Sequence, residues 1–277
     1  MTLFLTTVLT AALTSFASGI IGSYVVVKRM VFLSGSIAHS VLGGMGLFLW
    51  LSKTYDLPFL KPIYGAFLTA ILAAFLLGWI EHNYKQRKDA IIASIWSTGM
   101  AVGVIFISLT PGYNVELSNF LFGNILWVSG SDLMLLFVLD LFILVSVAIF
   151  YNQFLALCLD EEGARLQKIK TSLLYFFLLT LVAISIVLLI QIIGIILVLA
   201  LLSLPPMIAG QFTKNLMPMM GLSFLLSLIL SLFGLIFSFH FDWPIGATIA
   251  LCCSFAYALT LILKKIVIRK LSLNKPY

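Results

Sequence analysis

Hydrophobic residues fill most of the chain in long blocks, and short polar hinges separate these blocks. A helix that crosses a bilayer needs about 20 mostly apolar residues. The pattern predicts nine membrane-spanning helices, with approximate bounds 3–27, 33–51, 60–80, 90–109, 132–151, 171–190, 192–211, 217–238 and 244–264. The stretch 111–131 contains one proline and three glycines. It is more typical of a re-entrant or interfacial loop with a short helix than of a span.

Composition agrees with this pattern. The chain has 277 residues, of which 62% are hydrophobic and only 9% are charged, whereas soluble domains average roughly 25% charged residues. The expected fold is therefore all-α and polytopic, and residues 1–277 form one transmembrane domain with no room for a soluble one. The three cysteines include no C-x-x-C pair and are interpreted as small apolar fillers.

The basic residues predict the orientation of the chain. Cytoplasmic loops of membrane proteins carry an excess of lysine and arginine. An outside N-terminus leaves only Lys53 and Lys61 outside and places the C-terminus in the cytoplasm. The other basic residues then share the cytoplasmic side: Lys28, Arg29, Lys85, Arg87, Lys88, Arg165, Lys168, Lys170, Lys214, Lys264, Lys265, Arg269, Lys270 and Lys275. The net charge of +6 thus reflects topology and does not indicate nucleic acid binding.

Two ionisable residues fall well inside predicted spans. His39 lies inside the second predicted span, and Asp140 lies in the middle of the fifth. Ionisable side chains at membrane depth usually face a protein interior or a wet pathway. His39 is the main candidate for a functional site, and its neutral imidazole would be able to bind a metal ion. For Asp140, a second metal ligand and a structural hydrogen bond both remain open.

Asp242 is a third and weaker candidate. It precedes the last span in the sequence HFDWPIG, with His240 two residues before it, at the predicted outer mouth. There it could guide an arriving cation. Its alternative role is to cap the last helix before Pro244, since proline suits a first helical turn.

The longest cytoplasmic connection reads FLALCLDEEGARLQKIKTSLL from Phe154 to Leu174. Its acidic residues come early and its basic residues late, which is the order that a helix dipole favours. We expect a short amphipathic helix outside the membrane, within about 154–170. It either rests on lipid headgroups or docks a cytoplasmic subunit, and periodicity alone does not choose between the two.

Five motifs in one order along the chain resemble the membrane permease subunits of ATP-binding-cassette importers for zinc, manganese and ferrous iron. The first is Lys28-Arg29-Met30 followed by a segment with His39, which is similar to the family's basic pair, Gly-Asp-x-x-x-His and small residues. The others are LFGNIL (121–126) with Ser129 and Asp132, DEEGAR (160–165), QIIGIILVLALLSLPPMIAG (191–210) and DWPIG (242–246).

The resemblance implies a set of partners and a cargo. A cytoplasmic ATP-binding subunit would dock on the coupling helix through Asp160, Glu161, Glu162, Ala164 and Arg165. An extracytoplasmic metal-binding protein would deliver zinc, or else manganese or iron, and a second permease copy or homologue would complete a dimer in the bacterial cytoplasmic membrane. The chain has no G-x-x-x-x-G-K-[ST] loop. ATP hydrolysis is therefore expected on the partner, so that this chain is not itself an enzyme and binds no cofactor.

Three positions depart from the family pattern. Gly35 stands where the family has an aspartate four residues before the histidine, a spacing that would put both ligands on one helix face. Lys168 stands where a glycine commonly ends the coupling helix, and Pro205-Pro206-Met207 replaces Pro-Ala-Ala. Loss of the acid favours a softer, more transient metal site or a shift toward zinc.

Other functions remain open at this point. An ion-coupled secondary carrier would use Asp140 as its coupling residue and need no ATPase. A membrane enzyme would need His39 and Asp140 as an acid–base pair within hydrogen-bond reach of a substrate. An importer of a metal chelate such as a siderophore would keep the same architecture and need a wider pathway.

Overall fold

The computed structural model describes residues 3–83, 88–112, 116–123, 125 and 128–273, and every regular element in these ranges is a helix. The predicted all-α fold is confirmed. The basic residues Lys85, Arg87 and Lys275 lie outside the described residues. In chain order the helices are α1 (Leu3–Val27), α2 (Val31–Thr54), α3 (Pro62–Asn83), α4 (Lys88–Leu109), α5 (Glu116–Phe122), α6 (Gly130–Leu159), α7 (Glu161–Leu166), α8 (Thr171–Phe212), α9 (Leu216–Phe241) and α10 (Ile245–Leu273).

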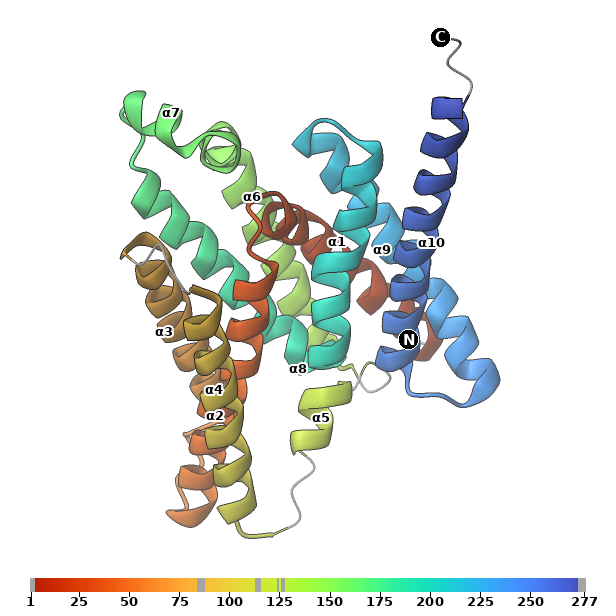
Figure 1. Cartoon of the computed structure of the whole chain (residues 1–277). Helices are drawn as coiled ribbons and strands as arrows, with labels where there is room; N and C mark the ends of the chain where they lie inside the picture. Colours follow the sequence, from red (N-terminus) through yellow and green to blue (C-terminus); the bar gives the residue numbers. More distant parts are fainter. Residues whose placement is uncertain (1–2, 84–87, 113–115, 124, 126–127, 274–277) are drawn as a thin grey trace.

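Eight of the described helices are long and apolar enough to cross a membrane. The longest, α8, has 42 residues and is interrupted by non-helical backbone at Gly194. Figure 1 shows that α8 runs away from α7 toward the opposite end of the molecule, turns there and comes back. Its two halves, 171–193 and 195–212, match the predicted sixth and seventh spans, so the prediction of about nine spans is confirmed. The loop 111–131 contains the short helix α5, as expected.

Close contacts between glycines bring α2 against α3 and α4. A Cβ added at Gly99 would lie 2.5 Å from the Cα of Ser40, and one at Gly103 would lie 2.5 Å from the carbonyl oxygen of Leu42. On another side of α2, the backbones of Gly44 and Gly65 are in direct contact. Small residues let helix backbones approach within membranes. The glycine-rich segments therefore pack these helices together within one bundle.

The first half of α8 forms the centre of the core, and α1 and α6 pack around it. Phe154 of α6 is fully buried and its ring lies edge-on to Tyr24 of α1 and stacked on Phe177 of α8. In contrast, α4 and α6 expose apolar side chains along much of their length. In a membrane protein such faces meet lipid or another subunit.

The short helix that the sequence predicted within about 154–170 is α7, which covers only the charged part of this range. Residues 154–159 continue α6, because this apolar stretch is helical and buries Phe154 and Leu157 in the core. Asp160 then leaves the helical conformation, with φ −150° and ψ 93°, and α7 covers only Glu161–Leu166. The apolar residues that open this connection thus belong to α6, and only the charged residues form the separate short helix.

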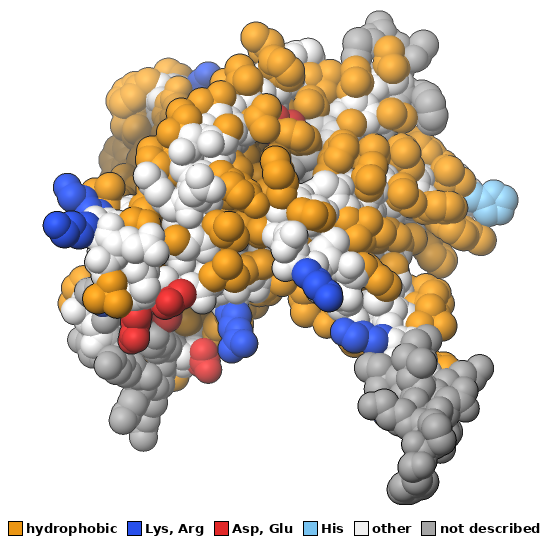
Figure 2. Space-filling model, turned by 90° about the horizontal axis from the view of Figure 1, so that it is seen from above, with side chains coloured by type: hydrophobic (Ala, Val, Ile, Leu, Met, Phe, Trp, Pro, Cys, Tyr) orange, Lys and Arg blue, Asp and Glu red, His pale blue; other side chains and the backbone are white. Residues whose placement is uncertain are grey.

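One end of the molecule carries α7, the α1–α2 corner, the α8–α9 turn and the C-terminal end of α10, and we call it the basic end (Figure 1). Figure 2 looks onto this end. At its left, acidic side chains lie beside basic ones, whereas its lower right shows only basic side chains among hydrophobic ones. The basic end thus has two electrostatically different parts.

Candidate functional site

His39 lies on α2 and stacks against an aromatic ring of α4. Its imidazole is 4.2 Å from the Trp96 ring, centroid to centroid, with an angle of 14° between the ring planes. The side chain is partly buried, and its Nδ1 has no hydrogen-bond partner among the described residues. The position is about 12 Å along the axis from the start of α2 at Val31, given a rise of 1.5 Å per residue. An unpartnered imidazole nitrogen is available to bind a metal ion.

The indole ring of Trp96 also lies next to Gly35. A Cβ added at Gly35 would lie 3.4 Å from Cζ3 of the Trp96 indole, which is ordinary van der Waals contact. The indole therefore covers the place toward which a carboxylate at position 35 would extend. The next residue, Ser36, is fully buried and donates a hydrogen bond of 3.0 Å to the carbonyl of Ile92 on α4. Stacking by an indole replaces the expected acidic neighbour of His39.

Asp140 is 5% exposed in the middle of α6, and neither carboxylate oxygen has a hydrogen-bond partner among the described residues. The structural hydrogen bond that the sequence allowed is therefore not formed. No hydrogen bond joins Asp140 to His39 either, since the Nδ1 of His39 is also without a partner. The described residues contain no group of three or more His, Cys, Asp or Glu side chains that could hold a metal.

Asp242 lies at the opposite end from α7 and is exposed. It caps the C-terminus of α9 in the left-handed conformation, with φ 53°, and its N–H donates to the carbonyl of Ser238. Asp242 therefore caps the end of α9, whereas the alternative role that the sequence offered was a cap at the start of the last helix. Ser238 also fixes this turn, because its hydroxyl donates 2.6 Å to the carbonyl of Trp243.

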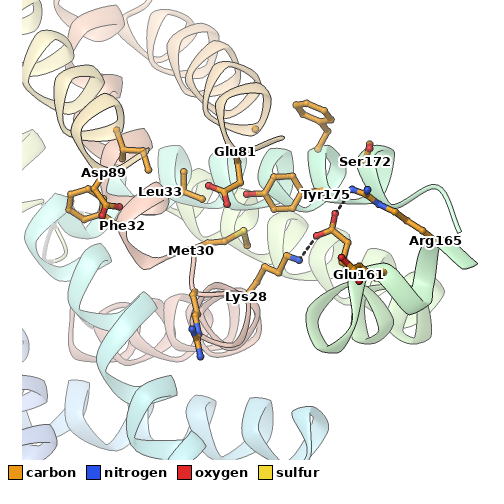
Figure 3. A pocket seen from close by; sticks show the side chains of 15 residues that line it. Lys28, Met30, Phe32, Leu33, Glu81, Asp89, Glu161, Arg165, Ser172 and Tyr175 are labelled. Carbon is orange, nitrogen blue, oxygen red and sulfur yellow. Dashed lines mark hydrogen bonds and ion pairs between the residues drawn. The ribbon is translucent and has the colours of Figure 1, made fainter. Parts of the chain in front are cut away.

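At the basic end, Glu161 of α7 is held by two cations. Lys28 Nζ and Arg165 Nη2 each lie 2.8 Å from one of its carboxylate oxygens (Figure 3). Lys28 also donates a hydrogen bond of 2.9 Å to the carbonyl of Leu157 on α6. The side chain of Lys28 is only 17% exposed, so this ion pair is less screened than a surface pair. Lys28 thus ties the end of α1 to both α6 and α7.

These contacts lower the pKa of Glu161. Partial burial raises the pKa of this carboxyl, but the hydrogen bonds and positive charges of Lys28 and Arg165 outweigh burial and bring it below its ordinary value. Glu161 is therefore ionised at neutral pH, and the ion pair that joins α7 to α1 persists there.

The rest of α7 is built by capping. The side chain of Asp160 accepts from the N–H of Gly163 at 2.9 Å, as an N-cap residue does. Ala164 is buried, while Glu162 and Arg165 face outward. After α7, Lys168 adopts φ 61°. This left-handed conformation is the one that favours glycine at helix ends, which accounts for the glycine expected there.

A cavity of about 800 Å³ opens between α7 and the first turns of α2, α4 and α8. We call it the coupling cavity. Lys28, Arg29 and Arg165 line it together with Glu81, Asp89, Glu161 and Glu162, so charges of both signs face it. Figure 3 shows the Lys28–Glu161–Arg165 contacts at its α7 side. Charged side chains on such a surface can change their ion-pair partners when an adjacent helix or subunit moves.

Two motif glycines meet at the end opposite α7. Gly123, after α5, and Gly194, at the break in α8, both have positive φ, and their backbones are in direct contact. A Cβ on either one would collide with the other's backbone. Of the block 121–126, residues 124 and 126 lie outside the described residues. The other motif residues named with this block, Ser129 and Asp132, form a capping box at the start of α6.

Comparison with known proteins identifies the family. The ABC 3 transport family matches residues 1–264. The chain belongs to this family. It is a multi-pass protein of the bacterial cytoplasmic membrane, as the resemblance implied. A probable metal transport system membrane protein of Chlamydia trachomatis is 46% identical over 91% of this chain and 85% of that protein.

Other family members are more distant but extend over nearly the same length. A manganese transport system membrane protein of Halalkalibacterium halodurans is 29% identical over 91% of this chain and 84% of that protein. A probable iron transport system membrane protein of Haemophilus influenzae is 30% identical over 94% and 93%. Among solved structures, PsaBC from Streptococcus pneumoniae in complex with Fab has a TM-score of 0.81 and 26% identity, covering 94% of this chain and 91% of that one.

Proposed function

We propose that the chain is the permease subunit of an ATP-binding-cassette importer that moves a divalent transition metal into the cytoplasm. Membership of the ABC 3 transport family supports the transport class, and the names of its relatives support a metal cargo. ATP hydrolysis belongs to a separate cytoplasmic subunit. An extracytoplasmic binding protein delivers the metal, and a second copy or a close homologue completes the pathway.

The observation that carries this proposal is the link between α7 and α2. Glu161 of α7 binds Lys28, and α2 begins at Val31, three residues further along the chain. His39 follows on the same helix, about two turns from its start. A force on α7 from a docked ATPase therefore reaches the helix that carries the candidate metal ligand through one partly buried ion pair. Through such a link, the ATPase could favour first one and then the other of two arrangements of the helix bundle.

The basic end is cytoplasmic in this proposal. The described basic residues gather there, with the exception of Lys53 and Lys61, in agreement with the positive-inside rule. The opposite end then receives metal from the binding protein. The exposed face of α4, which includes Ser94, Ser97 and Thr98 as well as apolar residues, is available to a second permease copy.

Zinc is the first cargo that we propose, followed by iron and manganese. A single imidazole without a nearby carboxylate suits zinc or ferrous iron, whereas manganese prefers oxygen ligands. Relatives named for manganese and iron transport keep both metals in the proposal. A single neutral imidazole ligand is also compatible with transport, because a metal ion that it binds weakly can dissociate again.

Reconstitution of the chain with its ATPase and binding protein in proteoliposomes tests the function. We expect uptake of radioactive zinc, iron or manganese. This uptake should require ATP on the side of the ATPase subunit and should stop when that subunit is omitted. Competition among the three metals then ranks the cargo.

The same preparation separates the importer from an ion-coupled carrier. Asp140→Asn leaves uptake within about twofold if Asp140 is not a coupling residue, since amide and carboxyl have similar volume. Uptake by the chain alone along an ion gradient, abolished in Asp140→Asn, would show that the chain is a secondary carrier.

A further inference from the structure

A second cavity, with a volume of about 930 Å³, lies at the basic end and shares no lining residue with the coupling cavity. It is formed by the last turns of α1 and α6, the α8–α9 turn and α10. We call it the α10 pocket. Its volume is at the upper end of the range for small-molecule sites. The residues of the Lys28–Glu161–Arg165 contacts are not among those that line it.

The chemistry of the α10 pocket differs from that of the coupling cavity. Its walls are mostly apolar and include Leu155, Leu159 and Leu261. Lys214 and Lys264 also line it, and no acidic residue does. Neither lysine has an ion pair or hydrogen bond with the described residues. The pocket therefore presents two uncompensated positive charges beside an apolar surface, as the lower right of Figure 2 illustrates for this part of the basic end.

Two further groups in the pocket favour an oxygen-rich anion. The α9 helix begins here at Leu216, after an N-cap residue, Asn215, whose side chain makes no capping bond, and it has no acid in its first turn. Free N–H groups and the helix dipole at such an N-terminus attract phosphate. The amide oxygen of Gln211 is buried without a hydrogen-bond partner. A buried polar atom of this kind requires a partner that the described residues do not supply.

The depth of the α10 pocket in the membrane favours a lipid as its ligand. Tyr151 and Tyr257 line it, and tyrosine is enriched where hydrocarbon meets headgroups. Tyr257 lies seven residues before Lys264, or about 10 Å along α10. The apolar walls thus face the hydrocarbon region while the lysines reach headgroup level. Basic pockets between membrane helices on the cytoplasmic side are suited to anionic phospholipids.

We propose that the α10 pocket binds an anionic phospholipid of the cytoplasmic leaflet. Its phosphate contacts Lys214, Lys264 and the N-terminus of α9, a headgroup hydroxyl donates to Gln211, and its acyl chains lie along α6 and α10. The proposal requires only that the chain spans the membrane with its basic end at the lipid surface, and it is independent of the transported metal.

Native mass spectrometry of the full chain in detergent, with phosphatidylglycerol or phosphatidylcholine added, tests this site. We expect phosphatidylglycerol to bind in preference to phosphatidylcholine. Lys214→Gln and Lys264→Gln should each weaken binding roughly fivefold, and together about thirtyfold, at about 1 kcal/mol for each lysine near a phosphate. Lys264→Arg, which keeps the charge, should bind as the unchanged chain does.

Lys265→Gln is the matched control, because Lys265 neighbours Lys264 on α10 but does not line the pocket. Equal losses in Lys264→Gln and Lys265→Gln would show a general surface attraction and overturn the proposal. Displacement of the lipid by millimolar inorganic phosphate would do the same, since it would show a free-phosphate site. Loss of the lipid when the ATPase subunit binds would show that protein covers the pocket, which also contradicts the proposal.

Discussion

Replacement of Glu161 by glutamine removes the charge that holds α7 to the α1–α2 corner. Glu161 accepts two charge-assisted hydrogen bonds of 2.8 Å, from Lys28 and Arg165. The Arg165 contact is an exposed i,i+4 pair, which contributes only about 0.3–0.5 kcal/mol. The Lys28 contact is better shielded, and a bond to a charged group contributes about 1.5–3 kcal/mol. Since the glutamine amide keeps one acceptor, the expected loss is about 1–2 kcal/mol.

A loss of this size corresponds to a roughly 5- to 30-fold change in the equilibrium between coupled and uncoupled α7. We therefore expect Glu161→Gln to reduce metal uptake per ATP hydrolysed several-fold in proteoliposomes, with ATP hydrolysis largely retained. Asp56→Asn is the control, because it removes an exposed carboxylate beyond the C-terminal end of α2, outside both α7 and the coupling cavity. Equal effects of the two substitutions would refute the assigned role of the Lys28–Glu161 pair.

The pH dependence of this contribution follows from the lowered pKa of Glu161. The unfolded chain binds the proton at the ordinary value of about 4.5, and the folded chain binds it only at lower pH. The stability contributed by Glu161 is thus fully present above pH 4.5 and is lost as pH falls through the folded pKa. The difference in stability between the unchanged chain and Glu161→Gln should be constant near neutral pH and narrow below about pH 4.5.

Five further substitutions, two of them controls, test the packing of the bundle by thermal unfolding in detergent. Gly99→Ala places a Cβ 2.5 Å from the backbone of α2 and should cost about 1–3 kcal/mol, whereas Gly221→Ala meets nothing within 4 Å and should be neutral or slightly stabilising. Gly194→Ala combines positive φ with a backbone collision and should prevent folding; Gly112→Ala, with positive φ but open space, should cost only about 1–2 kcal/mol. Lys168→Gly should be neutral or stabilising by up to about 1 kcal/mol, because Lys168 already has φ 61°. Destabilisation by Lys168→Gly, or equal melting of the paired alanine variants, would contradict these assignments.

Much of the fold could be predicted because the period and length of apolar blocks are local properties. The predicted boundary near residue 191 lies three residues from Gly194, where α8 breaks. The coupling helix was harder, since the sequence 154–159 is equally apolar in a membrane helix and in an amphipathic one. Only its burial against Tyr24 and Phe177 decides that it continues α6.

The site depended on contacts between distant residues, which periodicity cannot supply. The sequence singled out His39 and Gly35. The indole that packs against both belongs to Trp96 on α4, nearly 60 residues later in the chain. Likewise, Lys28 and Glu161 were predicted on the same membrane side without any sign that they pair. Their opposite charges in two predicted cytoplasmic connections are not a sufficient signal, because several other pairs of residues in these connections also have opposite charges.

Metal uptake by a His39→Ala variant in the ATP-driven complex tests the central claim most directly. If His39 contacts the metal in transit, uptake should fall at least tenfold while the complex still assembles and hydrolyses ATP. Trp96→Phe, which keeps an aromatic ring against the imidazole, should retain most of the uptake. Unchanged metal uptake in His39→Ala would show that the pathway does not pass this residue.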